Sequence, residues 1–307
     1  MQLRKEAGYI FSILGGICWA LAGVFGQYLF QFHQITPEWL VSIRLLCAGI
    51  ILIVVCKIRG RKIFSVWKEK KDIKDVIIFT IFGTALCQYS YFSAVATSNA
   101  ATATFISYTS PIFIIIFIAL KTRRKPALYE IISVFLVIAG IFVVATHGNI
   151  HSLYISGESL FWGILAAVTF AIYSIQPQRL MREFDTLLIT AWGMLIGGSM
   201  LISIFRPWNL NGLSNLHAYV AMGIIVLFGT ILSYIFFLEG IKRIGATRGS
   251  LLSSIEPVVA TILSVVCLNE TFEIIDLLGF ALILSTVVVL AKAPSHGSEV
   301  QTQKIWE

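Results

Sequence analysis

Apolar residues run along the chain in long stretches that are separated by short polar or charged segments. Bounding each stretch by charges and turn residues gives ten segments: 8–31, 37–57, 74–96, 98–120, 127–146, 157–178, 185–205, 217–240, 247–267 and 273–292. A helix of about 20 residues crosses the ~30 Å apolar core of a bilayer and satisfies its own backbone hydrogen bonds there. The pattern predicts an all-α integral membrane protein with ten transmembrane helices.

Composition supports this reading. Of the 307 residues 57% are hydrophobic and 13% are charged, whereas a soluble domain has about 45–50% apolar and about 25% charged residues. These values exclude a soluble globular protein and a disordered chain. Ten spans use roughly two thirds of the length and leave no room for a folded soluble domain.

Basic residues are concentrated in every second predicted loop. All 23 lysines and arginines except Arg44 and Arg206 lie in the N-terminal segment, in every second loop or after the last span. Basic residues stay in cytoplasmic loops, so we expect a protein of the bacterial inner-membrane type with both termini in the cytoplasm. The net charge of +7 then reflects topology and attraction to anionic inner-leaflet lipid, and nucleic acid is not an expected partner.

The two halves of the sequence align with each other. A shift of 146 residues places Phe82-Gly83-Thr84 on Phe228-Gly229-Thr230, Ser107 on Ser253 and Pro111 on Pro257. We predict two five-helix repeats, residues 1–147 and 157–293, followed by a cytoplasmic tail, 294–307. Five is an odd number, so the second repeat enters the membrane in the opposite sense. Inverted repeats are typical of secondary transporters with a site near the midplane, although duplication alone also makes a stable bundle.

The fourth and ninth spans carry hydroxyl side chains around a central proline. Pro111 and Pro257 lack the N–H that would bond the carbonyls of Ser107 and Ser253, and such freed carbonyls are tolerated at membrane depth where they meet side chains, water or a cavity. We therefore expect Ser107 and Ser253 to line a cavity and the two prolines to act as bending points. The alternative is that the hydroxyls patch the kinks and let the helices pack closely.

Two charged residues, Arg44 and Glu256, lie well inside spans, away from the span ends. Glu256 is the acid nearest the centre of any span, and an intramembrane charge is costly unless paired, protonated or hydrated. It is a candidate for neutralising an amine or carrying a proton, or it bonds a neighbouring helix. Arg44 is the basic residue inside a span; structural anchoring or pairing is the favoured interpretation, and binding of an anionic substrate group is the alternative.

Several aromatic residues lie far from the membrane interfaces. Trp19 is in the middle of the first span, and the tyrosine hydroxyls need hydrogen-bond partners in lipid. We expect these tyrosines to face a polar interior and to be candidates for substrate contact, with packing as the alternative. They are Tyr89, Tyr108, Tyr173 and Tyr234.

Other chemistry has little support. The five cysteines are scattered singly through apolar segments and the five histidines lie in loops or at span ends, so neither a metal site nor a cofactor is predicted. The phosphate-binding pattern GxxxxGK[ST] does not occur. With no paired acids inside the spans, we do not expect an enzyme.

Motifs in order along the chain resemble a known family. They are Gly15-Gly16-Ile17-Cys18-Trp19-Ala20, Arg44, the stretch from Ser107 to Pro111, the stretch from Phe228 to Tyr234, Ser253-Ser254-Ile255-Glu256-Pro257-Val258, Leu268-Asn269-Glu270 and Gly279-Phe280-Ala281-Leu282-Ile283. Together they resemble the EamA-type transporters of the drug/metabolite transporter superfamily over nearly the whole chain. The family usually ends its fourth span in an acid, where this chain has Arg123 and Arg124.

The resemblance implies a ten-helix carrier of small metabolites, commonly amino acids moved outward, through a central cavity lined by spans one, three, four, six, eight and nine. Those spans hold Trp19, Tyr89, Ser107, Tyr108, Tyr173, Tyr234 and Ser253. We therefore expect alternating access with a small-molecule substrate in a lipid bilayer. Proton coupling and facilitated diffusion both fit the sequence. The rival hypothesis is a membrane receptor or scaffold that transports nothing.

Overall fold

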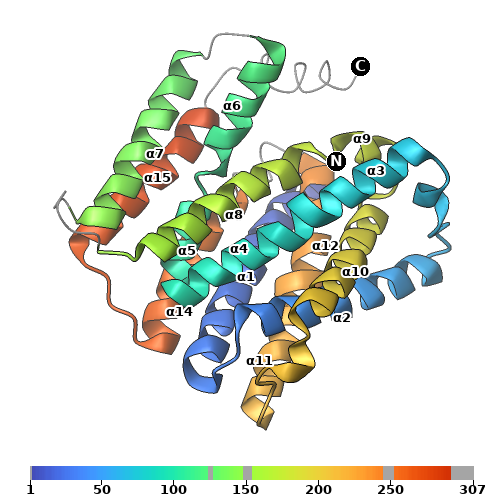
Figure 1. Cartoon of the computed structure of the whole chain (residues 1–307). Helices are drawn as coiled ribbons and strands as arrows, with labels where there is room; N and C mark the ends of the chain where they lie inside the picture. The colour runs from blue at the N-terminus through green and yellow to red at the C-terminus, as the bar shows by residue number, and fades with distance from the viewer. Residues whose placement is uncertain (1, 124–126, 148–153, 245–251, 292–307) are drawn as a thin grey trace.

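The computed structural model describes residues 2–123, 127–147, 154–244 and 252–291, and within them it is helical with no strand (Figure 1). The predicted tail and most of the segment between the predicted repeats lie outside these residues. In chain order the helices are α1 (Gln2–His33), α2 (Pro37–Ile58), η1 (Ser65–Trp67), α3 (Lys70–Ile78), η2 (Phe79–Ala85), α4 (Leu86–Thr97), α5 (Ala100–Ser107), α6 (Ser110–Thr122), α7 (Leu128–Thr146), α8 (Gly157–Ile175), α9 (Gln178–Glu183), α10 (Thr186–Phe205), η3 (Pro207–Asn209), α11 (Leu216–Val226), η4 (Leu227–Leu232), α12 (Ser233–Ile244), α14 (Ile255–Leu268) and α15 (Ile274–Ala291).

Among the described residues, eight helical runs are long and apolar enough to cross a bilayer. They are Glu6–His33, Pro37–Ile58, Lys70–Thr97, Ala100–Phe117, Leu128–Thr146, Gly157–Glu183, Thr186–Phe205 and Leu216–Gly240. Two further apolar helices, Ile255–Leu268 and Ile274–Thr286, are shorter. These two lie within the predicted ninth and tenth spans. The described chain is therefore a multi-pass bundle of apolar helices.

Short polar side chains begin several of the helices. The side chains of Thr36, Asn99, Ser156, Asp185 and Asn215 each accept a hydrogen bond from a backbone N–H in the first turn of the helix that follows. The first N–H groups of a helix lack partners within the helix, and these residues supply them. The polar segments between the apolar stretches thus set where α2, α5, α8, α10 and α11 begin.

The two prolines predicted inside spans each lie in the first turn of a helix. Helix α5 ends at Ser107, and α6 begins at Ser110 with Pro111 in its first turn. Likewise α14 begins at Ile255, and Pro257 follows in its first turn. Proline is tolerated there because the N–H it lacks would have no partner anyway. In the first half, the kink expected in one continuous helix is therefore an interruption between α5 and α6. In the second half, residues 245–251 of the predicted ninth span lie outside the described residues, and a turn at Ser254 comes just before α14.

Two π-helical segments, η2 and η4, occupy matching places in the sequence. Segment η2 contains Phe82-Gly83-Thr84 and η4 contains Phe228-Gly229-Thr230, the triplets that align at the 146-residue shift. A π-helical turn is rare and inserts an extra residue into the helix, often at a functional site. Both segments lead directly into the helices that carry central polar residues, α4 and α12.

The main helix pairs join the two halves of the chain. Helix α2 packs along α10, α7 along α15, α1 along α12 and α4 along α8. Figure 1 shows α7 and α15 side by side at one edge of the bundle, apart from α2 and α10. The halves are thus intertwined and do not form separate bodies.

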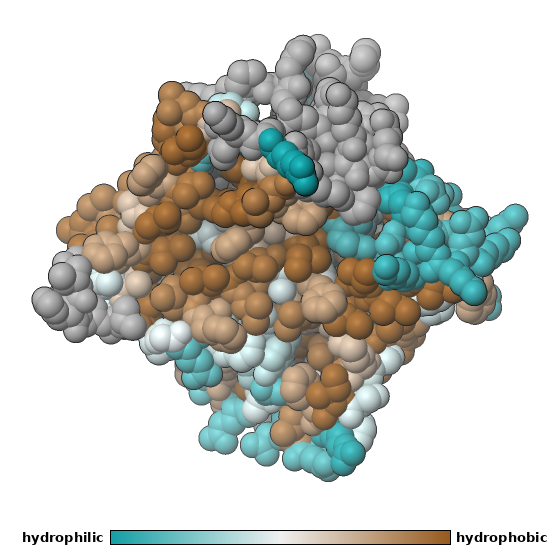
Figure 2. Space-filling model, turned by 45° about the horizontal axis from the view of Figure 1, so that its top comes forward, coloured by the Kyte–Doolittle hydropathy of each residue, from teal (hydrophilic) through white to brown (hydrophobic). Residues whose placement is uncertain are grey.

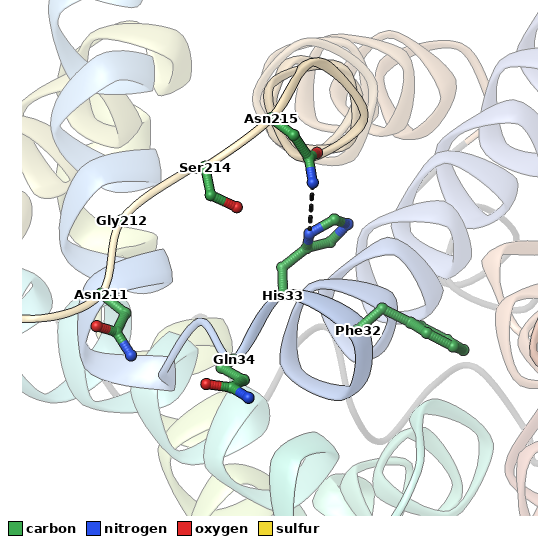
Figure 3. Close-up of a pocket in the computed structure, with 7 residues that line it drawn as sticks. All are labelled: Phe32, His33, Gln34, Asn211, Gly212, Ser214 and Asn215. Atoms are coloured by element: carbon green, nitrogen blue, oxygen red, sulfur yellow. Dashed lines mark hydrogen bonds between the residues drawn. The ribbon is translucent and has the colours of Figure 1, made fainter.

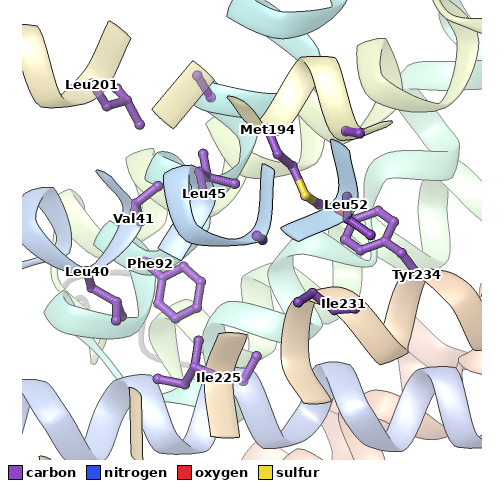
Figure 4. Packing of buried hydrophobic residues seen from close by; sticks show 14 of the residues in the cluster. Leu40, Val41, Leu45, Leu52, Phe92, Met194, Leu201, Ile225, Ile231 and Tyr234 are labelled. Atoms are coloured by element: carbon purple, nitrogen blue, oxygen red, sulfur yellow. The ribbon is translucent and has the colours of Figure 1, made fainter. Parts of the chain in front are cut away.

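The central core lies among α2, α4, α10 and α12. Leu45, Phe92 and Met194 are fully buried there, and Tyr234 joins them from α12 (Figure 4). The outside is also apolar: Figure 2 shows a wide hydrophobic band across the visible face, with hydrophilic residues gathered at its margins. Such a band suits lipid tails, since a soluble protein rarely exposes a contiguous apolar patch of this kind.

Candidate functional site

Three aromatic residues predicted as site residues meet inside the bundle. The rings of Trp19 on α1 and Tyr234 on α12 lie edge to face with centroids 5.6 Å apart. The ring of Tyr173 on α8 is 6.2 Å from that of Tyr234. Gln88 on α4 donates a hydrogen bond of 3.3 Å to the Tyr234 hydroxyl. Four helices therefore contribute to one aromatic and polar cluster.

A second group forms where α5 and α14 approach each other. The Tyr108 hydroxyl lies 3.1 Å from the carbonyl oxygen of Ser253 and 3.0 Å from Oε2 of Glu256. The Ser253 carbonyl is the one that the sequence predicted to lose its helical partner to Pro257, and the phenol supplies another. Three of the predicted site residues thus form one polar contact between the two halves of the chain.

Helix α1 can reach this group because Gly16 has no side chain. A Cβ added there would be 2.7 Å from the Ser253 carbonyl oxygen, closer than real Cβ contacts allow. The glycine therefore permits the backbone of α1 to touch the interrupted segment before α14. Trp19, three residues further along α1, is placed in the aromatic cluster by the same approach.

Tyr91 and Arg44 are both in contact with Phe92. The Tyr91 hydroxyl is 2.9 Å from Oγ1 of Thr104, and Tyr91 is close enough to interact electrostatically with both Glu256 and Arg44. The Arg44 guanidinium lies over the Phe92 ring, 4.7 Å from its centroid. A basic residue of the first half and an acidic residue of the second are thus both near Tyr91.

Two predicted site residues have other surroundings. The Tyr89 hydroxyl donates a hydrogen bond of 2.8 Å to Glu38, and its ring packs against Trp162 and Phe205. The Ser107 hydroxyl donates a hydrogen bond of 2.8 Å to the carbonyl of Ala103 in its own helix. Among the described residues, neither side chain forms a hydrogen bond with the clusters around Tyr234 or Glu256.

Sequence reasoning missed Gln88 and Thr104 as partners within the site. A signal for Gln88 was present, because the 146-residue shift places it on Tyr234. Thr104 was visible as a hydroxyl on the Ser107 face, but its partner Tyr91 belongs to another span. Sequence periodicity identifies the face of a helix and does not identify the facing residue.

A polar recess opens at one end of the bundle (Figure 3). It has a volume of about 430 Å³ and lies between the end of α1 and the segment before α11. Its lining residues are Phe32, His33, Gln34, Asn211, Gly212, Ser214 and Asn215. His33 and Asn215 face each other across it at 3.4 Å. The recess is large enough for a small molecule and carries no acid in its lining.

A compact ion-pair network joins α3 and α9. Arg179 on α9 contacts Asp72 at 2.6 Å, Asp75 at 2.8 Å and Glu183 at 3.1 Å. The Arg179 side chain is 9% exposed and that of Asp72 is 3% exposed. The network ties α3 of the first half to α9 of the second. In the described residues no group of three His, Cys, Asp or Glu side chains is arranged to hold a metal ion.

Comparison with known proteins agrees with the helical bundle. The sequence is 34% identical over 284 residues to the uncharacterized inner membrane transporter YicL of Salmonella typhimurium, covering 92% of this chain and 95% of the relative. It is 23% identical over 290 residues to the uncharacterized inner membrane transporter YedA of Escherichia coli K12, covering 90% of each chain. A crystal structure of another protein aligns over 100% of both chains with a TM-score of 0.63 at 17% identity, which supports the fold alone.

The family assignment rests on nearly the whole sequence. The sequence model of the EamA-like transporter family matches residues 6–146 and again residues 158–292. The relatives named as inner membrane transporters agree with a multi-pass membrane transporter. This chain therefore belongs to the EamA-like transporter family of the drug/metabolite transporter superfamily.

Proposed function

We propose that the chain is a secondary transporter that exports small amino-acid-like metabolites by alternating access between two inverted five-helix repeats. The proposal rests chiefly on one observation: both halves contribute side chains to a single buried cluster. Tyr108 of the first half contacts Ser253 and Glu256 of the second, and Gln88 contacts Tyr234. A site shared between repeats is what a rocking motion of one repeat against the other requires.

The helix pairs support the inverted repeat. Helix α2 pairs with α10 and α7 with α15, so the second and fifth helices of one half meet the second and fifth of the other. Helix α1 pairs with α12 and α4 with α8, which exchanges first and third helices between the halves. This exchange is what a two-fold axis between the repeats would produce. The paired π-helical segments η2 and η4 follow the same relation.

The roles of the site residues follow from their chemistry. Trp19, Tyr173 and Tyr234 offer aromatic walls for an apolar part of the substrate, and the hydroxyls of Tyr108 and Tyr234 offer hydrogen bonds. Glu256 would neutralise an amine or carry a proton. The interruptions before Pro111 and Pro257 would be the bending points. Tyr89 would act near a helix end through Glu38, and Ser107 would present its backbone, since its hydroxyl is already bonded.

The proposed topology places the basic loops and both termini in the cytoplasm of a bacterial cell. Single cysteines at Lys70, in the basic loop, and at Asn211, in the polar recess, test it in a background that lacks the five native cysteines. A membrane-impermeant maleimide added to whole cells should label position 211 and leave position 70 unlabelled until the cells are opened. Labelling of position 70 first would overturn the proposed topology.

Transport is tested with the purified chain in proteoliposomes loaded with an equimolar mixture of the twenty amino acids. Their loss from the vesicles is followed by mass spectrometry. We expect a subset to leave and Ser253→Trp, which fills the shared cluster, to abolish that loss. Ser199→Trp is the matched control because Ser199 is exposed on the bundle surface. If the wild-type chain carries none of them, or if Ser253→Trp transports normally, amino-acid transport through this site is excluded and a receptor or scaffold is favoured.

The same vesicles test whether transport is coupled to a proton gradient. A pH gradient is imposed in one set, and the two sides are held at equal pH in the other. A proton-coupled carrier should lose substrate from the vesicles faster in the first set than in the second, and Glu256→Gln should abolish that difference in rate. Equal rates in both sets would show facilitated diffusion.

A further inference from the structure

Arg44 is one of the most deeply buried side chains of the described residues. It lies on α2 about 10 Å along the axis from Pro37, and only 2% of its surface is exposed. An arginine that anchors a helix at the membrane interface extends its charged end into the headgroups. Arg44 does not do this, because its guanidinium is enclosed over Phe92 inside the bundle. The anchoring role favoured by the sequence therefore does not fit its surroundings.

Pairing does not account for Arg44 either. Its Nε and Nη1 atoms are buried and have no hydrogen-bond partner among the described residues, and none of the described acids lies within ion-pair distance of it. A buried guanidinium without an anion is costly, and proteins seldom leave such donors unmet. For comparison, buried Arg179 is surrounded by three carboxylates.

The neighbours of Arg44 belong to the candidate site. Tyr91, Tyr234 and Cys87 are close enough to interact with it electrostatically. Tyr234 is in contact with Trp19 and Gln88, and Tyr91 lies close to Glu256 as well. The unmet donors therefore sit at the edge of the cluster that both halves share.

We propose that Arg44 binds the carboxylate of the transported molecule. The guanidinium presents a planar fork of N–H donors that matches a carboxylate, and the cation–π contact with Phe92 holds the fork in place. The carboxylate would supply the anion that the empty protein lacks. This inference deepens the proposed function and rests on it: Arg44 would select for substrates with a carboxylate, while Glu256 would neutralise their amine.

Three variants test the proposal: Arg44→Met removes the charge, Arg44→Lys keeps it, and Arg206→Gln is the control at an exposed arginine. The first measurement is the unfolding temperature of the purified, ligand-free chain. Removing a charge that has no partner should leave this temperature unchanged or raise it. If Arg44 were paired within the fold, Arg44→Met would strip an acid of its partner and lower the temperature by several degrees, which would overturn the proposal.

The second measurement uses defined probes. Phenylalanine, benzoate and acetate are compared with phenylalaninamide, benzamide and acetamide for their ability to stabilise the chain. We expect stabilisation by at least one carboxylate, weaker stabilisation by its amide, and an affinity loss of about tenfold to hundredfold for the carboxylate in Arg44→Met. Arg44→Lys should retain part of the affinity, and Arg206→Gln should behave as wild type. Equal response to carboxylates and amides, or no response to either, rejects the assignment of Arg44.

The vesicle assay separates this inference from the proposed function. If wild-type chain exports amino acids and Arg44→Met exports the same ones at the same rate, the role of Arg44 is wrong and the transport function stands. If the wild-type chain exports none while carboxylates still stabilise it through Arg44, the carboxylate site stands and the proposed export does not.

Discussion

Gln88 donates its amide hydrogen to the hydroxyl of Tyr234 over 3.3 Å, and the two residues are 146 positions apart in the chain. The same offset aligns Phe82-Gly83-Thr84 with Phe228-Gly229-Thr230 and Pro111 with Pro257. Gln88 and Tyr234 are therefore counterparts from the two halves. Two counterparts touch only close to an axis that relates the halves, so the axis of the proposed inverted repeat would pass near this hydrogen bond.

Tyr234→Phe should destabilise the chain. The change removes the acceptor for the Gln88 amide, and an unmet polar group in a buried site costs about 1–3 kcal/mol. Thermal unfolding in a fixed detergent should show a lower midpoint. In Gln88→Leu/Tyr234→Phe both partners are apolar, so the double variant should recover part of the loss. If the two single effects simply add, Gln88 and Tyr234 are not coupled.

Helices α2 and α10 offer a second test of the symmetry. A Cβ added at Gly49 would be 2.4 Å from the backbone nitrogen of Leu195, and one added at Gly198 would be 2.4 Å from that of Leu46. The glycine of each helix thus lets the backbone of a leucine on the other helix approach closely. Gly49→Ala and Gly198→Ala should each push the helices apart and cost about 1–3 kcal/mol, measured as a lower unfolding midpoint.

Gly223→Ala is the matched control for this pair. Gly223 lies within α11, and a Cβ there would meet nothing within 4 Å. Because alanine favours a helix over glycine by about 1 kcal/mol, this variant should be as stable as wild type or more so. A similar loss of stability in all three variants would contradict the close contact between α2 and α10.

Much of the fold could be predicted from the sequence, because a bilayer imposes a simple rule on it. Each crossing needs a long apolar helix, so segments such as 37–57 and 185–205 correspond closely to α2 and α10. Pro111 and Pro257 each lie in the first turn of a helix. The sequence did not show that the helix stops before each proline, since a lone proline is compatible with a kink or with an interruption.

The partners of the site residues were harder to predict. Ser253 was identified from its place before Pro257, Tyr108 as a tyrosine far from the interfaces, and Glu256 as an acid inside a span. Their mutual contact depends on how α5 and α14 cross. Tyr89 lies inside an apolar span, as Tyr234 does, but its hydroxyl donates a hydrogen bond to Glu38 near a helix end. Arg44 was interpreted as an anchor because its distance from the helix end allowed that, and only the packing of Phe92 over it shows the enclosure. Tertiary contacts of this kind leave no local signal.

Arg179→Ala should be one of the most damaging single changes in the chain. It removes the partner of Asp72, whose side chain is 3% exposed, and breaking a buried ion pair from one side costs about 3–5 kcal/mol. The unfolding midpoint should fall strongly, and added salt should change it little because the network is shielded from solvent. Arg182→Ala, at an exposed position on the same helix, is the control and should be close to neutral. Comparable losses in the two variants would contradict the network.

Glu270 should hold one end of the bundle closed. The side-chain amides of Gln27 and Gln31 donate hydrogen bonds of 2.5 Å and 3.2 Å to Glu270. The side-chain oxygen Oε1 of Gln27 accepts a hydrogen bond from the N–H of Ala100 at the start of α5. These bonds join α1 and α5 to the residues after α14. The register places Arg124 opposite Glu270 in the first half, so an acid of this kind is absent from the matching position. Glu270→Ala removes charge-assisted bonds worth about 1.5–3 kcal/mol each, and the end of the bundle near Glu270 should open more often.

Spin labels at Phe32→Cys and Thr271→Cys, in a background without the five native cysteines, report this opening as a distance distribution. Both positions are exposed, so the labels should not disturb the contact. We expect a single short distance in the chain with Glu270 and a second, longer population in Glu270→Ala. Glu69→Ala, an exposed acid at the other end of α2, should leave the distribution unchanged. An unaltered distribution in Glu270→Ala would mean that apolar packing between α1 and α14 closes this end without the carboxylate.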